Sequence, residues 1–302
     1  MAILPRTLLT QPAPAAVAAV SLFGFTILAM SAHQTMERQR VHAAYEVPCD
    51  GLEDELGARQ FWESQDYVRF AHCLEQKSDS AGAVEVAAEG LGPFPRSEAL
   101  YNLKAYNEIK LRAFDDAVTT LESGIRAIGT PSNGVMENNL AWAYLWVGDG
   151  GTDRARGLVN TSLRREPSVC ETLHTGMFVE FEIARTRSGL ERADALRNFQ
   201  SLRTRYHQCE NRDQAWSTAV EAAGAAVLYN EVELLVESGW DQHGQDQTLR
   251  VTAQTLRKNF PSASVSGVCA EAMPLRDLRG ACVERVQAAI RMTSPARENC
   301  AR

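Results

Sequence analysis

The chain has 302 residues and a formal net charge of −7; 45% of its residues are hydrophobic and 23% are charged. This composition is typical of a globular protein with a buried core, and it is too apolar for a disordered chain. The acidic balance argues against a protein that binds nucleic acid over a wide basic surface.

A long uncharged segment lies near the N-terminus. Residues 13–32 read APAAVAAVSLFGFTILAMSA, and at ~1.5 Å per residue a helix of this length crosses the hydrocarbon core of a bilayer. We therefore expect a short tail over residues 1–12, a transmembrane helix acting as a signal anchor over 13–32, and a linker over 33–50. The alternative is a signal peptide cleaved near the small residues at Ala29–Ser31, which would release a secreted protein.

The remainder of the chain has the apolar periodicity of helices. It runs from about Leu52 to Gln254, without the sustained alternation typical of strands. Two stripes at helical spacing are separated by a short break at Lys110–Ala113, and they consist of Leu100, Leu103 and Ala105, then Ala117, Val118, Leu121 and Ile125. Because so short a link leaves two helices antiparallel, we expect an all-α domain of helix pairs over residues 51–260.

The segment LAWAYLWVGDGGTDRARGLVNTSLRREP, residues 140–167, contains one such pair. Its glycines follow no strand and precede no lysine, so they indicate a turn between helices rather than a phosphate-binding loop. Thr152 or Asp153 can cap the second helix, which ends at Pro167.

These helix pairs resemble tetratricopeptide (TPR) repeats, which recur about every 34 residues. The best unit has small, aromatic, glycine and proline residues in the order of that family, at Ala141, Tyr144, Gly148, Ala155 and Pro167. The preceding unit keeps Ala105, Phe114, Ala117, Leu121 and Gly124, but has Glu108 where an aromatic is expected and Arg112 where a glycine is expected; the following unit keeps Gly189, Ala195 and Phe199. The resemblance is good over residues 97–207 and weak over 50–96 and 210–260. It implies an α-solenoid whose concave face binds a protein or peptide segment.

The C-terminal residues 261–302 differ from the repeats. A segment rich in Pro, Ser and Gly indicates a linker, and a final helix and a polar tail are expected after it.

The seven cysteines suggest hairpin-closing disulfides. Cys49 with Cys73, and Cys170 with Cys209, flank predicted antiparallel helices, while Cys282 could meet Cys269 or Cys300. Disulfides would place the body on the extracytoplasmic (periplasmic) side. Scattered reduced thiols, with a body facing the cytoplasm, are the alternative.

A metal site is a second interpretation of some of these residues. Cys170, His174, His207 and Cys209 would converge if their helices fold back on each other, and they form a possible zinc ligand set. The spacing matches no standard zinc motif, and we expect no metal, no cofactor and no catalytic residues. A metal-binding protein or an enzyme that uses this cluster remains the alternative function.

Two groups of residues are candidates for partner binding. Trp142 and Trp146 either face the concave groove as binding anchors or pack between repeats. Arg185 and Arg192 belong to an arginine-rich helix pair, which is a solvated face or a docking site for an acidic partner or anionic headgroups. The sequence therefore predicts a membrane-anchored scaffold that binds another protein without chemistry and does not bind nucleic acid. An accessory or assembly subunit of a membrane complex is one role that fits this prediction.

Overall fold

A computed structural model describes Cys49 and residues 51–148, 151–209, 215–236, 242–260 and 263–293. All secondary structure within these ranges is helical. The helices are α2 (Leu52–Gly57), α3 (Ser64–Gln76), α4 (Ser80–Leu91), α5 (Glu98–Lys110), α6 (Phe114–Ile128), α7 (Val135–Val147), α8 (Thr152–Arg165), α9 (Cys170–Thr186), α10 (Gly189–His207), α11 (Ala215–Val236), α12 (Gln242–Asn259), α13 (Val265–Ala272), the 3-10 helix η1 (Arg276–Leu278) and α14 (Arg279–Thr293).

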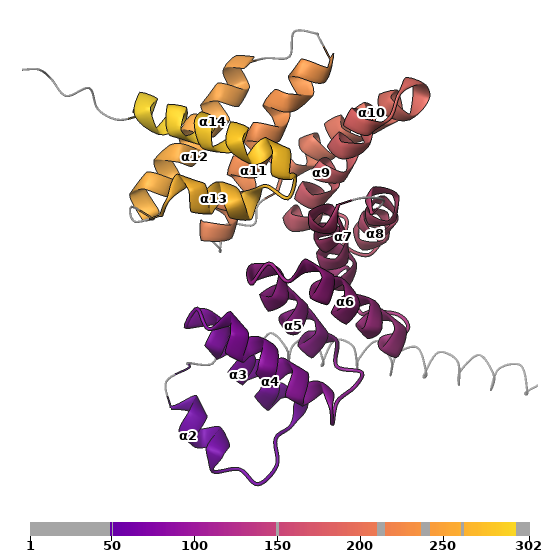
Figure 1. Ribbon diagram of the computed structural model, residues 1–302, viewed down its shortest axis with the longest axis vertical. Helices are drawn as coiled ribbons and strands as arrows, with labels where there is room; N and C mark the ends of the chain where they lie inside the picture. The colour runs from indigo at the N-terminus through magenta and orange to yellow at the C-terminus, as the bar shows by residue number, and fades with distance from the viewer. Residues whose placement is uncertain are drawn as a thin grey trace, which may run out of the picture.

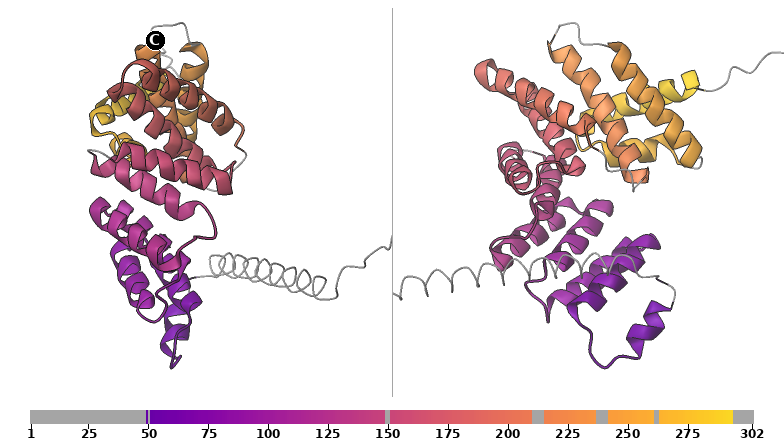
Figure 2. Two further views of the ribbon diagram at one scale, coloured as in Figure 1. Left: turned by 90° about the vertical axis from the view of Figure 1, so that its right-hand side faces the viewer. Right: turned by 180° about the vertical axis from the view of Figure 1, so that it is seen from behind.

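Consecutive helices form pairs, and the pairs stack into a curved array (Figure 1). The first helices of successive pairs, α3, α5, α7, α9 and α11, each contact the next. The helices α4, α6, α8 and α10 lie outside them, so the first helices line the inner side of the curve, which we call the concave face (Figures 1 and 2). This arrangement confirms the predicted TPR-like α-solenoid.

Small residues allow the paired helices to approach each other. Ala141 and Ala155 are fully buried between α7 and α8. Gly124 on α6 faces Tyr101 and Met136 so closely that an added Cβ would lie 2.5 Å from the Met136 Cε. The small residues that carry the TPR resemblance are therefore packing residues.

Arg112 occupies the position at the α5–α6 turn where the repeat pattern has a glycine, and its backbone has the conformation that glycine favours. Arg112 has a φ of 64°, in the left-handed region that favours glycine. Glu108, where the family has an aromatic residue, is buried and pairs with Lys104. Both departures from the repeat pattern are thus accommodated by local contacts.

The C-terminal segment packs as part of the helical body rather than as a linker. Ser264 accepts a hydrogen bond from the backbone N–H of Gly267 and caps α13, whose Val268, Cys269 and Ala272 join the main core. The expected linker over this segment is therefore wrong in part, because the short helix α13 has too few residues to show a periodic pattern. The expected final helix is present as η1 and α14.

Within the described residues, no helix has both the length and the apolar character needed to cross a membrane. The tail, transmembrane helix and linker expected over residues 1–12, 13–32 and 33–50 lie outside the described residues, apart from Cys49.

Candidate functional site

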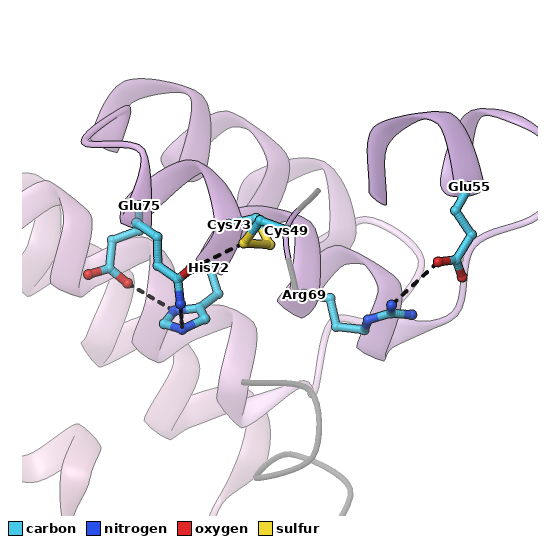
Figure 3. The surroundings of a disulfide bond; sticks show 7 residues. Cys49, Glu55, Arg69, His72, Cys73 and Glu75 are labelled. Carbon is cyan, nitrogen blue, oxygen red and sulfur yellow. Dashed lines mark hydrogen bonds and ion pairs between the residues drawn. A yellow bond between two sulfur atoms is a disulfide. The ribbon is translucent and has the colours of Figure 1, made fainter. Parts of the chain in front are cut away.

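The first disulfide joins the start of the described chain to α3. Cys49 and Cys73 are bonded, with their Cα atoms 5.4 Å apart (Figure 3). Beside the bond, His72 Nδ1 lies 3.1 Å from Glu75 Oε2, and the Gln76 amide lies 3.0 Å from the other ring nitrogen of His72. Although burial raises the pKa of Glu75, the hydrogen bond to His72 and the charge of Lys110 give a net lowering.

Two further disulfides close helix pairs, as the sequence predicted. Cys170 at the start of α9 is bonded to Cys209 just after α10, with Cα atoms 5.8 Å apart. Cys269 on α13 is bonded to Cys282 on α14, with Cα atoms 5.7 Å apart. Of the two partners predicted for Cys282, the structure therefore has Cys269. Cys300 lies outside the described residues.

The four possible zinc ligands, Cys170, His174, His207 and Cys209, do not form a metal site in this structure. The sulfur atoms of Cys170 and Cys209 are used in the disulfide. The ring of His174 is buried against aromatic neighbours, and that of His207 lies 5.5 Å from the Tyr229 ring. Among the described residues, no group of three or more His, Cys, Asp or Glu side chains is placed to hold a metal ion. The residues fit a disulfide beside a histidine better than a zinc site.

The arginine-rich helix pair α9–α10 is held by internal contacts. Arg185 pairs with Glu182 and, at 2.7 Å, with Asp277. Arg192 donates to the Leu235 carbonyl across the gap to α11 at 2.6 Å. The other arginines of the pair also have partners: Arg187 with Asp153, Arg197 with Asp194, Arg203 over the Tyr229 ring and Arg205 with the Pro167 carbonyl. Most of these arginines contact residues of another helix or loop, Arg197 pairs within α10, and each has a partner within the described residues.

Trp146 is a packing residue. Its side chain is only 4% exposed, and its ring stacks on Phe114 at 4.6 Å between centroids, with an angle of 11°. The guanidinium of Arg279, from the C-terminal segment, lies 4.4 Å from its ring centroid, and that of Arg112 lies 5.3 Å away. Trp146 therefore packs against neighbouring elements, and its selection as a candidate for partner binding is wrong, because its buried ring is closed to a partner.

Of the two candidate tryptophans of α7, Trp142 is the one that retains exposed surface. It is partly buried and lies on α7 against α9, with its ring 5.6 Å from both His174 and Phe178. The His174 ring lies 6.0 Å from that of Tyr206, at the end of α10. Burial lowers the pKa of His174 to about 3, although a backbone hydrogen bond with Glu221 opposes the shift. This histidine is therefore neutral at physiological pH and serves as an aromatic support under Trp142.

Two carboxylates, Glu171 at the start of α9 and Glu221 on α11, lie close enough to Tyr206 for their charges to add to burial in raising the pKa of its hydroxyl. Burial, and then the charge of Glu171, raise the pKa of Glu221 on α11 to about 8. Neither glutamate forms an ion pair with another residue of the described ranges. Burial, then the charges of Glu75, Glu271 and Glu221, raise the pKa of Tyr106 on α5 to about 12. Arg112, two residues after α5, donates a hydrogen bond to the Ala270 carbonyl of α13 at 2.9 Å, so the end of α5 lies beside α13.

The sequence did not single out this group of residues. Glu221, Glu171, Tyr106 and Tyr206 lie on four helices, and their proximity depends on the curvature of the array. Their spacing along the chain matches no motif that would predict a shared site. Only an amphipathic reading of each helix that placed acidic and aromatic residues on the same inner side could have found them.

Comparisons with known proteins concern the architecture. No family model matches the sequence, and no curated protein sequence matches it significantly. Among solved structures, the chain is similar to YrrB, described as a TPR protein with an unusual peptide-binding site, with 14% identity, a TM-score of 0.43 and coverage of 71% of this chain and 95% of that chain. It is also similar to PilF of Pseudomonas aeruginosa, with 11% identity, a TM-score of 0.48 and coverage of 78% and 96%, and to the Cut9–Hcn1 hetero-tetramer of the APC/C, with 12% identity, a TM-score of 0.49 and coverage of 86% and 48%.

Proposed function

We propose that this protein is a scaffold that binds a basic segment of a protein partner on its concave face. The observation that carries the proposal is the pair Glu171 and Glu221. The charges of both act on Tyr206, that of Glu171 also acts on Glu221, and neither glutamate pairs with a cation among the described residues. A lysine or arginine from a partner would supply that cation. Recognition of this kind requires no chemistry, and we propose a binding protein rather than an enzyme.

The physical basis is the cost of two adjacent carboxylates in a desolvated place. Burial, and then the like charge of Glu171, raise the pKa of Glu221 to about 8, so it holds a proton at neutral pH. A guanidinium or ammonium group between the glutamates would favour their ionised forms and gain attraction from the faces of the aromatic rings. Binding of the cation would therefore release a proton, and it should become tighter as the pH rises toward 8.

A second part of the proposal concerns the membrane anchor and the compartment of the protein. We propose that residues 13–32 anchor the protein in a membrane with its body on the extracytoplasmic side, where it serves as an accessory or assembly subunit of a membrane complex. The length of the uncharged segment and the three disulfides support this arrangement. An anchor would raise the effective concentration of the scaffold near membrane partners.

Peptide selection tests the binding proposal. The full chain in detergent is used to select from a random peptide library at pH 8 and at pH 6. We expect enrichment of Lys and Arg, stronger at pH 8. The double variant Glu171→Gln/Glu221→Gln should lose both the enrichment and its pH dependence, while Glu85→Gln, which removes an exposed carboxylate on α4, should behave as the wild type. Selection of acidic or purely apolar peptides by the wild type would refute the proposed partner class.

Thiol counting tests the compartment and the metal alternative together. Protein extracted from its native membrane should have one thiol open to alkylation after denaturation, at Cys300, and all seven after reduction. Seven free thiols without reductant would contradict the extracytoplasmic location. Stoichiometric zinc, with thiols released by a chelator, would instead support the metal site.

A further inference from the structure

Three arginines converge where the C-terminal segment meets the repeats. Arg112 lies in the α5–α6 turn, and Arg276 and Arg279 lie at η1 and at the start of α14. We call them the arginine junction. The α11–α14 bundle lies opposite α5 across the curve of the array (Figure 1).

Two of these arginines share one ring. The guanidinium carbons of Arg112 and Arg279 lie 5.3 Å and 4.4 Å from the ring centroid of Trp146. Arg112 Nη2 donates to the Ala270 carbonyl at 2.9 Å, and Arg279 Nε donates to the Met273 carbonyl at 3.1 Å. These hydrogen bonds fix both side chains, so the positive charges are held near each other by the fold.

The third arginine joins them through the helix geometry. Arg276 precedes Arg279 by three residues in a continuous helical segment, and residues at this spacing are neighbours on a helix surface.

No carboxylate of the described residues neutralises the junction. None of the three arginines forms an ion pair within these ranges, whereas Arg156 and Arg165 on α8 each pair with a glutamate. The neighbouring acid Asp277 is used by Arg185 at 2.7 Å. The Nη2 atom of Arg279 is buried without a hydrogen-bond acceptor. Burial, and then the charges of Arg112 and Arg276, lower the pKa of Arg279.

We infer that the arginine junction binds a doubly charged oxyanion, as free phosphate or as the phosphoryl group of a larger molecule. Guanidinium groups that lie near one another suit the oxygens of phosphate, which can accept two parallel N–H bonds from one guanidinium group. A bound dianion would relieve the repulsion among the arginines and give Arg279 Nη2 an acceptor. The inference does not depend on the proposed binding of a basic segment, because it involves other residues and the opposite charge.

Thermal unfolding of the full chain in detergent tests the inference. The melting temperature is measured against sodium phosphate, replaced by sodium chloride at constant ionic strength, and separately against glycerol phosphate. We expect a saturable rise of a few degrees. Whichever anion gives the lower half-saturation concentration identifies the source of the oxyanion, free or carried.

Matched variants separate a site from the general stabilising effect of phosphate on proteins. Arg276→Gln removes an exposed side chain of the junction, and we expect at least a tenfold higher half-saturation concentration. Arg291→Gln makes the same change, also at an exposed position, in the last turn of the same helix and should leave the value unchanged. Absence of saturation in the wild type with both anions, or equal responses of the two variants, would overturn the inference.

Discussion

At the scale of single residues, the glycines show how closely the helices pack. An added Cβ at Gly124 would lie 2.5 Å from Met136 Cε and 2.6 Å from Tyr101 Cγ, whereas one at Gly157 on α8 would meet nothing within 4 Å. We expect Gly124→Ala to destabilise the fold by about 1–3 kcal/mol through overpacking. Gly157→Ala should stabilise it by about 0.5–1 kcal/mol, because alanine favours a helix. Urea unfolding of both variants gives the comparison, and equal effects would contradict the packing described for α6.

Glu221 should give the stability of the protein a pH dependence of its own. Its pKa is raised to about 8 by burial and Glu171, from an ordinary value of 4.5. Between these values the folded state holds a proton that the unfolded state has released, so this group makes the free energy of unfolding fall as the pH rises, by at most about 1.4 kcal/mol per unit. Above about pH 8 the contribution is constant. Glu221→Gln should therefore gain stability over the wild type from pH 5 to pH 8.

His174 also changes the free energy of unfolding with pH, in the opposite direction to Glu221, because its pKa is lowered to about 3. Its folded state resists protonation, so its contribution to stability is lost as the pH falls below about 6.5. The difference between wild type and Glu221→Gln cancels this shared contribution in unfolding measured at pH 5, 6, 7 and 8. A difference that does not change with pH would show that Glu221 titrates normally.

At the scale of elements, the disulfides differ in the length of chain that they close. Cys170–Cys209 spans 39 residues and Cys269–Cys282 spans 13. Loop entropy assigns them about 4 and about 3 kcal/mol of stabilisation. We expect the double serine variant of the first pair to unfold at a lower denaturant concentration than that of the second. The reverse order would mean that the α13–α14 bond acts mainly through native packing.

The elements also show what could be predicted from the sequence. The helix pairs from α5 to α10 follow from local spacing and small residues such as Ala141 and Ala155, and the disulfides follow from the antiparallel pairing of helices. Helix α13 was missed because Ser264, Gly267 and Pro274 give the composition of a linker, although the segment is buried against α11. The acidic concave face and the arginine junction depend on contacts between distant helices, which no local pattern contains.

At the scale of the whole molecule, stability is distributed unevenly. One large core extends from α7 to α14, while three smaller clusters hold α2 to α6 and join α6 to α7. The central helix α9 is buried at every position from 172 to 181 and contacts α7, α8, α10 and α11. In stacked repeats each unit contacts mainly its neighbours, so an end unit can open without the rest.

Hydrogen exchange should reveal this gradient. Amides of α9 and α11 are expected to exchange slowest, and those of α2 and α4 fastest, because opening the N-terminal units exposes only the small clusters around Leu56 and Ala87. Each 1.4 kcal/mol of difference in opening free energy slows exchange about tenfold, so rates should differ by orders of magnitude. Exchange followed by mass spectrometry at two pH values distinguishes opening equilibria from intrinsic rates. If α4 were protected as strongly as α9, the repeats would unfold as one unit. The prediction that the N-terminal units open independently would then be wrong.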